Sequence, residues 1–374
     1  MNKMGDGTAT EPPTALAMGK TENERKDIPA LQIQYNRFVR KRLYWLIVLT
    51  VILAASFLIN VATGPASIPI STVLSGLFSP DSLPDALRVI LWDVRLPYAV
   101  MALAVGACLG HAGAEMQTVL NNPLASPATL GVTYAATLGA SLVIVFDFTL
   151  PLDIPQHFAL PVFAFIGAVL SILLIQFLAK FYGPSLEGII LFGIAIVFAL
   201  QALVSLIQFA ADSDSLQQIV FWTMGSLARA TWDKIGIITV VLAICFLFSI
   251  RQVWNLTIMR NGEEFARSAG VPVERLRFTT LLRVSVVAAV AVAFTGVIGF
   301  VGLVGPHIAR LICGEDHRFY LPASALAGAL MLSAASLASK TIIPGVLIPD
   351  GIVTALVGVP MFLGLLLSHG ARWR

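Results

Sequence analysis

The chain carries little charge. Aspartate, glutamate, lysine and arginine together make up 12% of its 374 residues, about half the share found in ordinary soluble domains. Hydrophobic residues make up 57%, and the mean hydropathy is +0.85. These values exclude an ordinary soluble domain and favour a chain that lies largely within a lipid bilayer.

Uncharged stretches long enough to cross a membrane recur along the chain. A bilayer core about 30 Å thick needs roughly 20 apolar residues in a helix. The stretches are 43–80, 96–114, 116–146, 154–179, 188–211, 235–250, 284–309, 319–339 and 351–371. Pro306 and the glycine-rich run before it are expected to divide 284–309 into a full helix and a short one. We therefore predict an all-α polytopic membrane domain over residues 43–374, with about ten transmembrane helices.

Cysteine is scarce and shows no paired spacing. The three cysteines are Cys108, Cys245 and Cys313. An odd number without a recurring spacing argues against a disulfide framework or a cysteine metal site. His307 and His317 lie near Glu315 and Asp316, where a metal site is conceivable, but a solvated helix end explains these residues better. No metal ligands are predicted.

The signatures of several enzyme classes are missing too. The chain has no glycine-rich phosphate loop ending in Lys-Ser or Lys-Thr, so it is not expected to bind ATP as P-loop proteins do. It has no His-Glu-x-x-His zinc helix and no Gly-x-Ser-x-Gly nucleophile elbow. The sequence predicts neither an enzyme nor a cofactor bound by this chain.

Lysine and arginine are distributed unequally between the two predicted sides of the membrane. If the N-terminus is cytoplasmic, only five of the 24 face outward, as the positive-inside rule expects. The five are Arg88, Arg95, Arg229, Lys234 and Lys340. Residues 1–42 are interpreted as a disordered cytoplasmic tail, and the C-terminus is predicted to be cytoplasmic as well. Because topology explains the basic residues, no nucleic-acid partner is predicted.

A short basic loop, residues 251–283, lies between two uncharged spans. Its charged residues are Arg251, Arg260, Arg267, Arg275, Arg277 and Arg283, with Glu263, Glu264 and Glu274 among them. Such a loop suits a membrane protein that presents a folded surface to a soluble partner.

The loop contains the signals of a short helix. Asn261 is expected to cap a helix that begins at Gly262, where Glu263 and Glu264 are favourable in the first turn.

A stop signal follows. Gly270 and Pro272 are expected to end this helix after about two turns. A second short helix from Val273 is expected to lead into the membrane at about Arg283.

Two ionisable residues fall inside a predicted membrane helix. His111 and Glu115 are four residues apart and therefore share one helical face. We expect them to satisfy each other, or to reach the cytoplasmic interface near Gln117. An intramembrane ionisable residue is also a functional candidate, so the alternative is a role in the translocation pathway.

Several motifs in register resemble one family of membrane transport proteins. They are RLPY at 95–98, GACLGHAGAEMQ at 106–117, NPLASP at 122–127, LGV at 130–132, WTMGS at 222–226, FVGLVGPHIAR at 300–310 and PDGIVTALVGVP at 349–360. In order and spacing they resemble the FecCD family of ABC importer permeases, which carry ferric siderophores, haem and cobalamin. The resemblance runs from about residue 43 to the end of the chain.

The resemblance gives the basic loop a role. It implies that residues 261–282 form the coupling helices that dock into a groove on an ATPase subunit. The matching positions are Asn261, Gly262, Glu263, Glu264, Ala266, Arg267, Gly270 and Pro272. A solvated linker stabilised by ion pairs is the alternative, and both the helix signals and the resemblance favour docking.

The resemblance also implies a docking surface for a periplasmic binding protein. Arg95 and Lys340 match two outward-facing basic positions of the family. Tyr98 stands where the family has a further arginine, so Arg88 or Arg229 is expected to compensate. Charged pairs of this kind mainly steer the encounter between two proteins.

The implied protein is the permease subunit of an ATP-driven importer in a bacterial inner membrane, with a ferric siderophore as its expected cargo. Its implied partners are two ATPase subunits that use ATP and magnesium, a second permease subunit, a periplasmic binding protein and membrane lipid. Haem and cobalamin remain alternative cargoes. An ion-coupled secondary transporter is the rival class, but the sequence has no clear inverted repeat and only His111 and Glu115 as candidate coupling groups.

Overall fold

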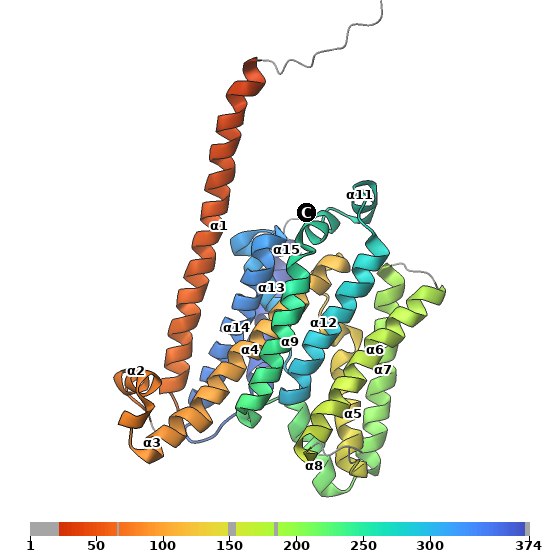
Figure 1. Ribbon diagram of the computed structural model, residues 1–374. Coiled ribbons are helices and arrows are strands. Elements are labelled where there is room, and N and C mark those ends of the chain that lie inside the picture. The colour runs from red at the N-terminus through yellow and green to blue at the C-terminus, as the bar shows by residue number, and fades with distance from the viewer. Residues whose placement is uncertain (1–21, 66, 149–154, 183–185, 371–374) are drawn as a thin grey trace, which may run out of the picture. The chain divides into compact units, whose positions relative to one another are not determined.

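The computed structural model describes residues 22–65, 67–148, 155–182 and 186–370. Within these ranges the regular elements are helices, and no residue is in a strand. Their bounds are α1 Glu22–Ala62, α2 Ile70–Phe78, α3 Asp85–Val89, α4 Leu96–Val119, α5 Val132–Phe146, α6 Ala159–Tyr182, α7 Leu186–Ala210, α8 Ser213–Thr223, α9 Trp232–Ile250, α10 Val253–Met259, α11 Glu263–Ser268, α12 Val273–Thr295, α13 Val301–Cys313, α14 His317–Thr341 and α15 Asp350–Gly370 (Figure 1).

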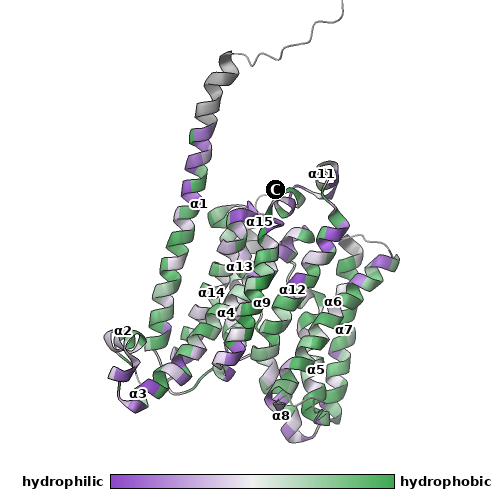
Figure 2. Cartoon of the chain, viewed as in Figure 1, coloured by the Kyte–Doolittle hydropathy of each residue, from purple (hydrophilic) through white to green (hydrophobic). Residues whose placement is uncertain are grey.

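The helices of membrane-spanning character match the predicted number. Among the described residues, seven helices are long and apolar enough to cross a bilayer, and three shorter apolar helices accompany them. The shorter ones are Val132–Phe146, Val301–Cys313 and Asp350–Gly364. Figure 2 shows hydrophobic residues along most of the length of α6, α7 and α9. The prediction of an all-α polytopic protein is confirmed.

The chain divides into two compact units, residues 1–44 and 45–374. In the first unit α1 begins at Glu22, so the prediction of a disordered tail is wrong for residues 22–42. Residues 30–44 contain neither glycine nor proline, so nothing in that stretch interrupts a helix. Residues 1–21 of the predicted tail lie outside the described residues.

In the second unit, α4 and α12 form the buried centre. Along α4, small residues let neighbouring helices approach closely. A Cβ atom added at Gly110 would lie 2.2 Å from the carbonyl oxygen of Ser324, and one at Gly113 would lie 1.8 Å from that of Gly302. Glycine is required at both positions, because no other residue fits there without moving α13 or α14.

The predicted break in 284–309 exists, but its position differs from the expectation. The chain leaves the α-helical conformation between α12 and α13, where Gly296 has φ +77° and Phe300 has φ +65°. Pro306 lies inside α13 and does not make the break. Proline leaves the carbonyl four residues earlier without its helical donor, and that carbonyl, of Gly302, accepts the Gln117 side-chain amide at 3.5 Å.

The second unit has two ends, which we call the α11 end and the α3 end after the helices found there (Figure 1). The α3 end also holds the start of α9, since the Trp232 indole donates to the carbonyl of Trp92 at 3.0 Å. All five arginines and lysines predicted to face outward lie on elements at the α3 end. The basic loop lies at the α11 end.

Candidate functional site

The coupling segment, as we call residues 251–283, folds into three helical pieces where two were predicted. The additional piece is α10, whose Leu256 and Met259 are buried. These two side chains face inward, on a helix that contacts α4 and α14, whereas Trp254 of the same helix is exposed. The sequence signal for this piece was present, because an apolar residue recurs at helical spacing from Val253 to Met259.

The turns that bound α11 depend on two glycines. The residue that precedes α11 is Gly262, with φ +106°, and no side chain caps the helix. The predicted cap at Asn261 and the predicted start at Gly262 are therefore each wrong by one residue. Gly270 ends the helix with φ +80°, as expected. Positive φ at both positions explains the glycines, since a side chain there is strained.

The second predicted coupling helix is not separate. Val273 begins α12, which continues without interruption to Thr295. Its first turn is therefore continuous with the part of α12 that lies in the centre of the bundle. Arg277 and Arg283, predicted as loop residues, are 4% and 8% exposed.

Ion pairs attach α11 to α12. The Glu263 carboxylate accepts hydrogen bonds from Arg267 at 2.7 Å and from Arg277 at 2.6 Å, and Arg267 also donates to Glu274. Partial burial raises the pKa of Glu263, but the hydrogen bonds from the two arginines outweigh it and hold the pKa below its usual value. Ala266, on the inner face of α11, is fully buried. A small rigid helix results.

The outer face of α11 is free to meet another molecule. Phe265 is 53% exposed, and Glu264 and Arg267 are exposed beside it. An exposed aromatic residue with charges around it is the usual composition of a protein-binding surface. Figure 1 shows α11 protruding at its end of the unit. This face of α11 is therefore open to solvent.

Glu115 does not have the partner that was predicted. Its carboxylate, which is fully buried, accepts two hydrogen bonds from Arg283, at 2.9 Å to Oε2 and 2.5 Å to Oε1. His111 Nε2 lies 3.7 Å from the Glu115 carboxylate and instead shares a hydrogen bond of 3.1 Å with Ser249. The expectation that His111 and Glu115 satisfy each other is wrong, because the longer arginine reaches the carboxylate from α12.

The residues once considered for a metal site have other partners. Both ring nitrogens of His317 share hydrogen bonds with threonines, at 2.7 Å to Thr118 and 3.2 Å to Thr257. Glu315 pairs with Arg260 at 2.9 Å and with Arg310 at 3.0 Å. Among the described residues no group of three potential ligands is placed to hold a metal ion.

At the α3 end, Arg95 and Lys340 point into the protein. Arg95 is 6% exposed and donates to the carbonyls of Val61 and Ala62 at 3.2 and 2.9 Å. Lys340 donates to the backbone and side-chain oxygens of Asn60 at 3.0 and 2.6 Å. Both cations therefore satisfy groups at the end of α1, a favourable place for positive charge.

A buried carboxylate that sequence reasoning missed lies beside them. Asp350, with no exposed surface, accepts a hydrogen bond of 2.8 Å from the Tyr98 hydroxyl and one of 2.8 Å from the Leu227 amide. Lys340 lies 4.4 Å from the centre of the Tyr98 ring. Tyr98 thus replaces an arginine with a neutral donor, and Asp350 joins α4, α15 and the turn after α8. Its position in the first turn of a helix was the available signal.

The remaining candidate cations differ in exposure. The side chain of Arg88 is 53% exposed and lies 3.3 Å from that of Asp81. Arg229 is half-buried, and desolvation lowers its pKa. Arg88 is therefore the more accessible of the two to a protein that approaches the α3 end.

The fold is that of a multi-span membrane protein, and its similarity to known transport permeases places it in the ABC transporter class. Residues 52–368 match the model of the FecCD transport family. The chain therefore belongs to the FecCD transport family.

Individual relatives agree with this assignment. The hemin transport system permease protein HmuU of Yersinia pestis is 35% identical over 332 residues, which cover 88% of this chain and 96% of the relative. The vitamin B12 import system permease protein BtuC of Vibrio vulnificus is 34% identical over 293 residues, 78% of this chain and 87% of the relative. A solved inward-facing structure, assigned to the metal-chelate type of ABC transporter, is 30% identical and covers 87% of this chain and 99% of its own, with a TM-score of 0.75.

Proposed function

We propose that this chain is the permease subunit of an importer that carries a ferric siderophore across a bacterial inner membrane. The observation that carries the proposal is α11, a rigid helix held by two positive-φ glycines and by ion pairs at one end of a membrane bundle. In this proposal α11 docks into a groove on an ATPase subunit, and both termini and the coupling segment are cytoplasmic.

The contacts around α11 support a route for motion. Glu263 joins α11 to Arg277 of α12, and Arg283 of the same helix joins Glu115 of α4. A movement of α11 on the ATPase surface would be transmitted through α12 to the centre of the bundle. Two ATPase subunits and a second permease subunit, identical or homologous, complete the proposed pathway. ATP and magnesium are used by the ATPase, and this chain binds no cofactor of its own.

The α3 end is the proposed contact for a periplasmic binding protein. Arg88 is the more exposed candidate cation there. Arg229, another of the five cations predicted to face outward, is half-buried. Arg95 and Lys340 take a second role in this proposal: they hold the end of α1 beneath the docking surface.

The cargo is proposed as a metal chelate, with a ferric siderophore as the specific expectation. Two relatives are named as permeases for hemin and vitamin B12, which, like a ferric siderophore, enclose a metal ion in a large organic ligand. Haem and cobalamin therefore remain the alternative cargoes.

Uptake in cells that lack this chain tests the proposal. Cells are supplied with radiolabelled ferric siderophores, haem and cobalamin, with and without the restored gene. Restoration of ferric-siderophore uptake alone supports the proposed cargo, and restoration of haem or cobalamin uptake instead replaces it. Uptake that persists with an inactivated ATPase but stops when the proton gradient collapses would point to the secondary transporter.

A further inference from the structure

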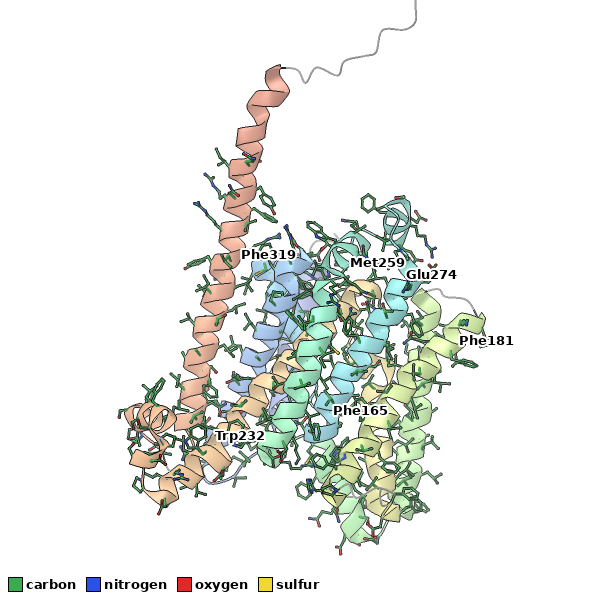
Figure 3. All side chains as sticks on the ribbon, viewed as in Figure 1. Phe165, Phe181, Trp232, Met259, Glu274 and Phe319 are labelled. Carbon is green, nitrogen blue, oxygen red and sulfur yellow. The ribbon has the colours of Figure 1, made fainter. Side chains whose placement is uncertain are left out.

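A groove of about 700 Å³ lies between α6, α7 and α12 at the α11 end, within the size range of ligand sites. Its apolar lining includes Leu173 and Phe177 of α6, Ile189 of α7, and Phe278 and Leu281 of α12. Figure 3 labels Phe181 and Glu274, the chain neighbours of Lys180 and Arg275, at the same end of the unit.

Two cations stand at the rim of this groove without a partner. Lys180 and Arg275 line it and are exposed, and among the described residues neither side chain makes a hydrogen bond or an ion pair. Among the described residues, the other charged residues that line the groove are engaged: Glu274 accepts a hydrogen bond from Arg267, and Arg277 donates to Glu263. The rim therefore has positive charge to offer to a ligand.

Polarity changes along each wall in the same direction. On α6, Leu173, Gln176 and Lys180 follow one another at spacings of three and four residues, so they share a face that ends in a cation. On α12, which runs the opposite way, Arg275 comes first and Phe278 and Leu281 follow deeper. Each wall thus carries a cation at the end of the bundle and apolar surface farther in.

Gln176 lies between the charged and apolar zones. Its side-chain nitrogen and oxygen are both shielded from solvent and have no hydrogen-bond partner among the described residues. A buried amide without partners is costly, and a ligand with ester or hydroxyl groups at that depth would satisfy it.

From this arrangement we propose that the groove binds an anionic phospholipid, with its headgroup between Lys180 and Arg275, its glycerol ester region at Gln176 and an acyl chain along Leu173, Phe177 and Leu281. Positive charge near the surface of a membrane helix attracts anionic headgroups. Arg275 lies in the first turn of α12, within the coupling segment, so the bound lipid would contact the helix that, in the proposed function, transmits movement from α11.

Native mass spectrometry of the purified full chain tests the proposal. The protein is incubated with equal amounts of dioleoylphosphatidylglycerol, which is anionic, and dioleoylphosphatidylcholine, which is zwitterionic. The unaltered chain should retain one phosphatidylglycerol in preference, and excess inorganic phosphate should not displace it. Equal retention of the two lipids, or displacement by phosphate, would overturn the proposal.

Variants assign the preference to the groove. Lys180→Gln and Arg275→Gln should each reduce the preference for phosphatidylglycerol about fivefold, whereas Arg251→Gln, an exposed arginine at the same end outside the groove, should leave it unchanged. Leu173→Trp should block the acyl-chain path, and Leu174→Trp, its exposed neighbour outside the groove, should not. If a control variant changes lipid binding as much as its matched groove variant does, the assignment of the lipid to this groove is wrong. Cation variants that keep the lipid preference but lose a copurifying ATPase would assign Lys180 and Arg275 to that partner instead.

Discussion

The guanidinium of Arg283, on α12, donates two hydrogen bonds to the carboxylate of Glu115, on α4, and both side chains are buried. This pair joins α12, which begins in the coupling segment, to α4, whose glycines pack closely against α13 and α14. Gln252 and Thr280 accept weaker hydrogen bonds from the same arginine, at 3.4 and 3.3 Å. The charge of Glu115 inside the membrane is therefore compensated locally.

Breaking this pair on one side should destabilise the protein more than removing it entirely. Glu115→Leu leaves the Arg283 charge buried and unpaired, which costs about 3–5 kcal/mol, whereas the double variant Glu115→Leu with Arg283→Met should recover most of that loss. Thermal unfolding in detergent measures the difference. His111→Leu is the comparison: His111 lies 3.7 Å from the Glu115 carboxylate but makes no hydrogen bond to it, so this variant should destabilise the protein less than Glu115→Leu does. A double variant no more stable than the single one contradicts the pairing.

Gly270 should tolerate asparagine far better than valine. Its φ of +80° is unfavourable for a β-branched residue by about 1–2 kcal/mol, while asparagine adopts it more readily, and no atom lies within 4 Å of a Cβ built there. We expect Gly270→Val to insert normally but to transport poorly, and Gly270→Asn to transport near the normal rate. Substrate-stimulated ATPase activity in proteoliposomes is the measurement. Normal coupling in the valine variant would remove α11 from the coupling role.

Charge reversal at the α3 end should separate docking from stability. Arg88→Glu alters an exposed side chain, so it should slow association of the binding protein at low salt without lowering thermal stability. The difference in association rate from the unaltered chain should shrink at physiological salt, where the screening length is about 8 Å. Arg95→Glu should chiefly lower stability, because it removes the donor to Val61 and Ala62. Arg251→Glu, at the opposite end, is the control for association. An unchanged association rate for Arg88→Glu at low salt would exclude it from the interface.

Two glycine-to-alanine changes should have opposite effects. At Gly113 the added methyl group meets the Gly302 carbonyl, so helices α4 and α13 must separate, at a cost of about 1–3 kcal/mol. At Gly236, in α9, no atom lies within 4 Å, and alanine should stabilise the helix by up to about 1 kcal/mol. Thermal melting of the two purified variants gives the comparison. A Gly113→Ala protein as stable as the parent would refute the close approach.

The amino-acid sequence by itself determined the class of the protein, the number of apolar helices and the family. These follow from composition, from runs of uncharged residues and from motifs such as 106–117, all of which are local in the chain. Gly270 was predicted correctly for the same reason: a glycine followed two residues later by proline is a local signal for a turn. Local signals were less exact at helix ends, where Gly262 replaced Asn261 as the first flanking residue of α11.

Tertiary structure alone decided which charged residues face each other. Glu115 and Arg283 are 168 positions apart, and Lys340 reaches Asn60 across 280 positions, so no periodicity within one helix could pair them. His111 was the nearest partner by sequence, yet helix packing brings a longer and permanently charged side chain to Glu115. The partners of Arg95 and Lys340 were hidden for the same reason. A cation at a helix end looks free until the neighbouring helix, with its unpaired carbonyls, is placed beside it.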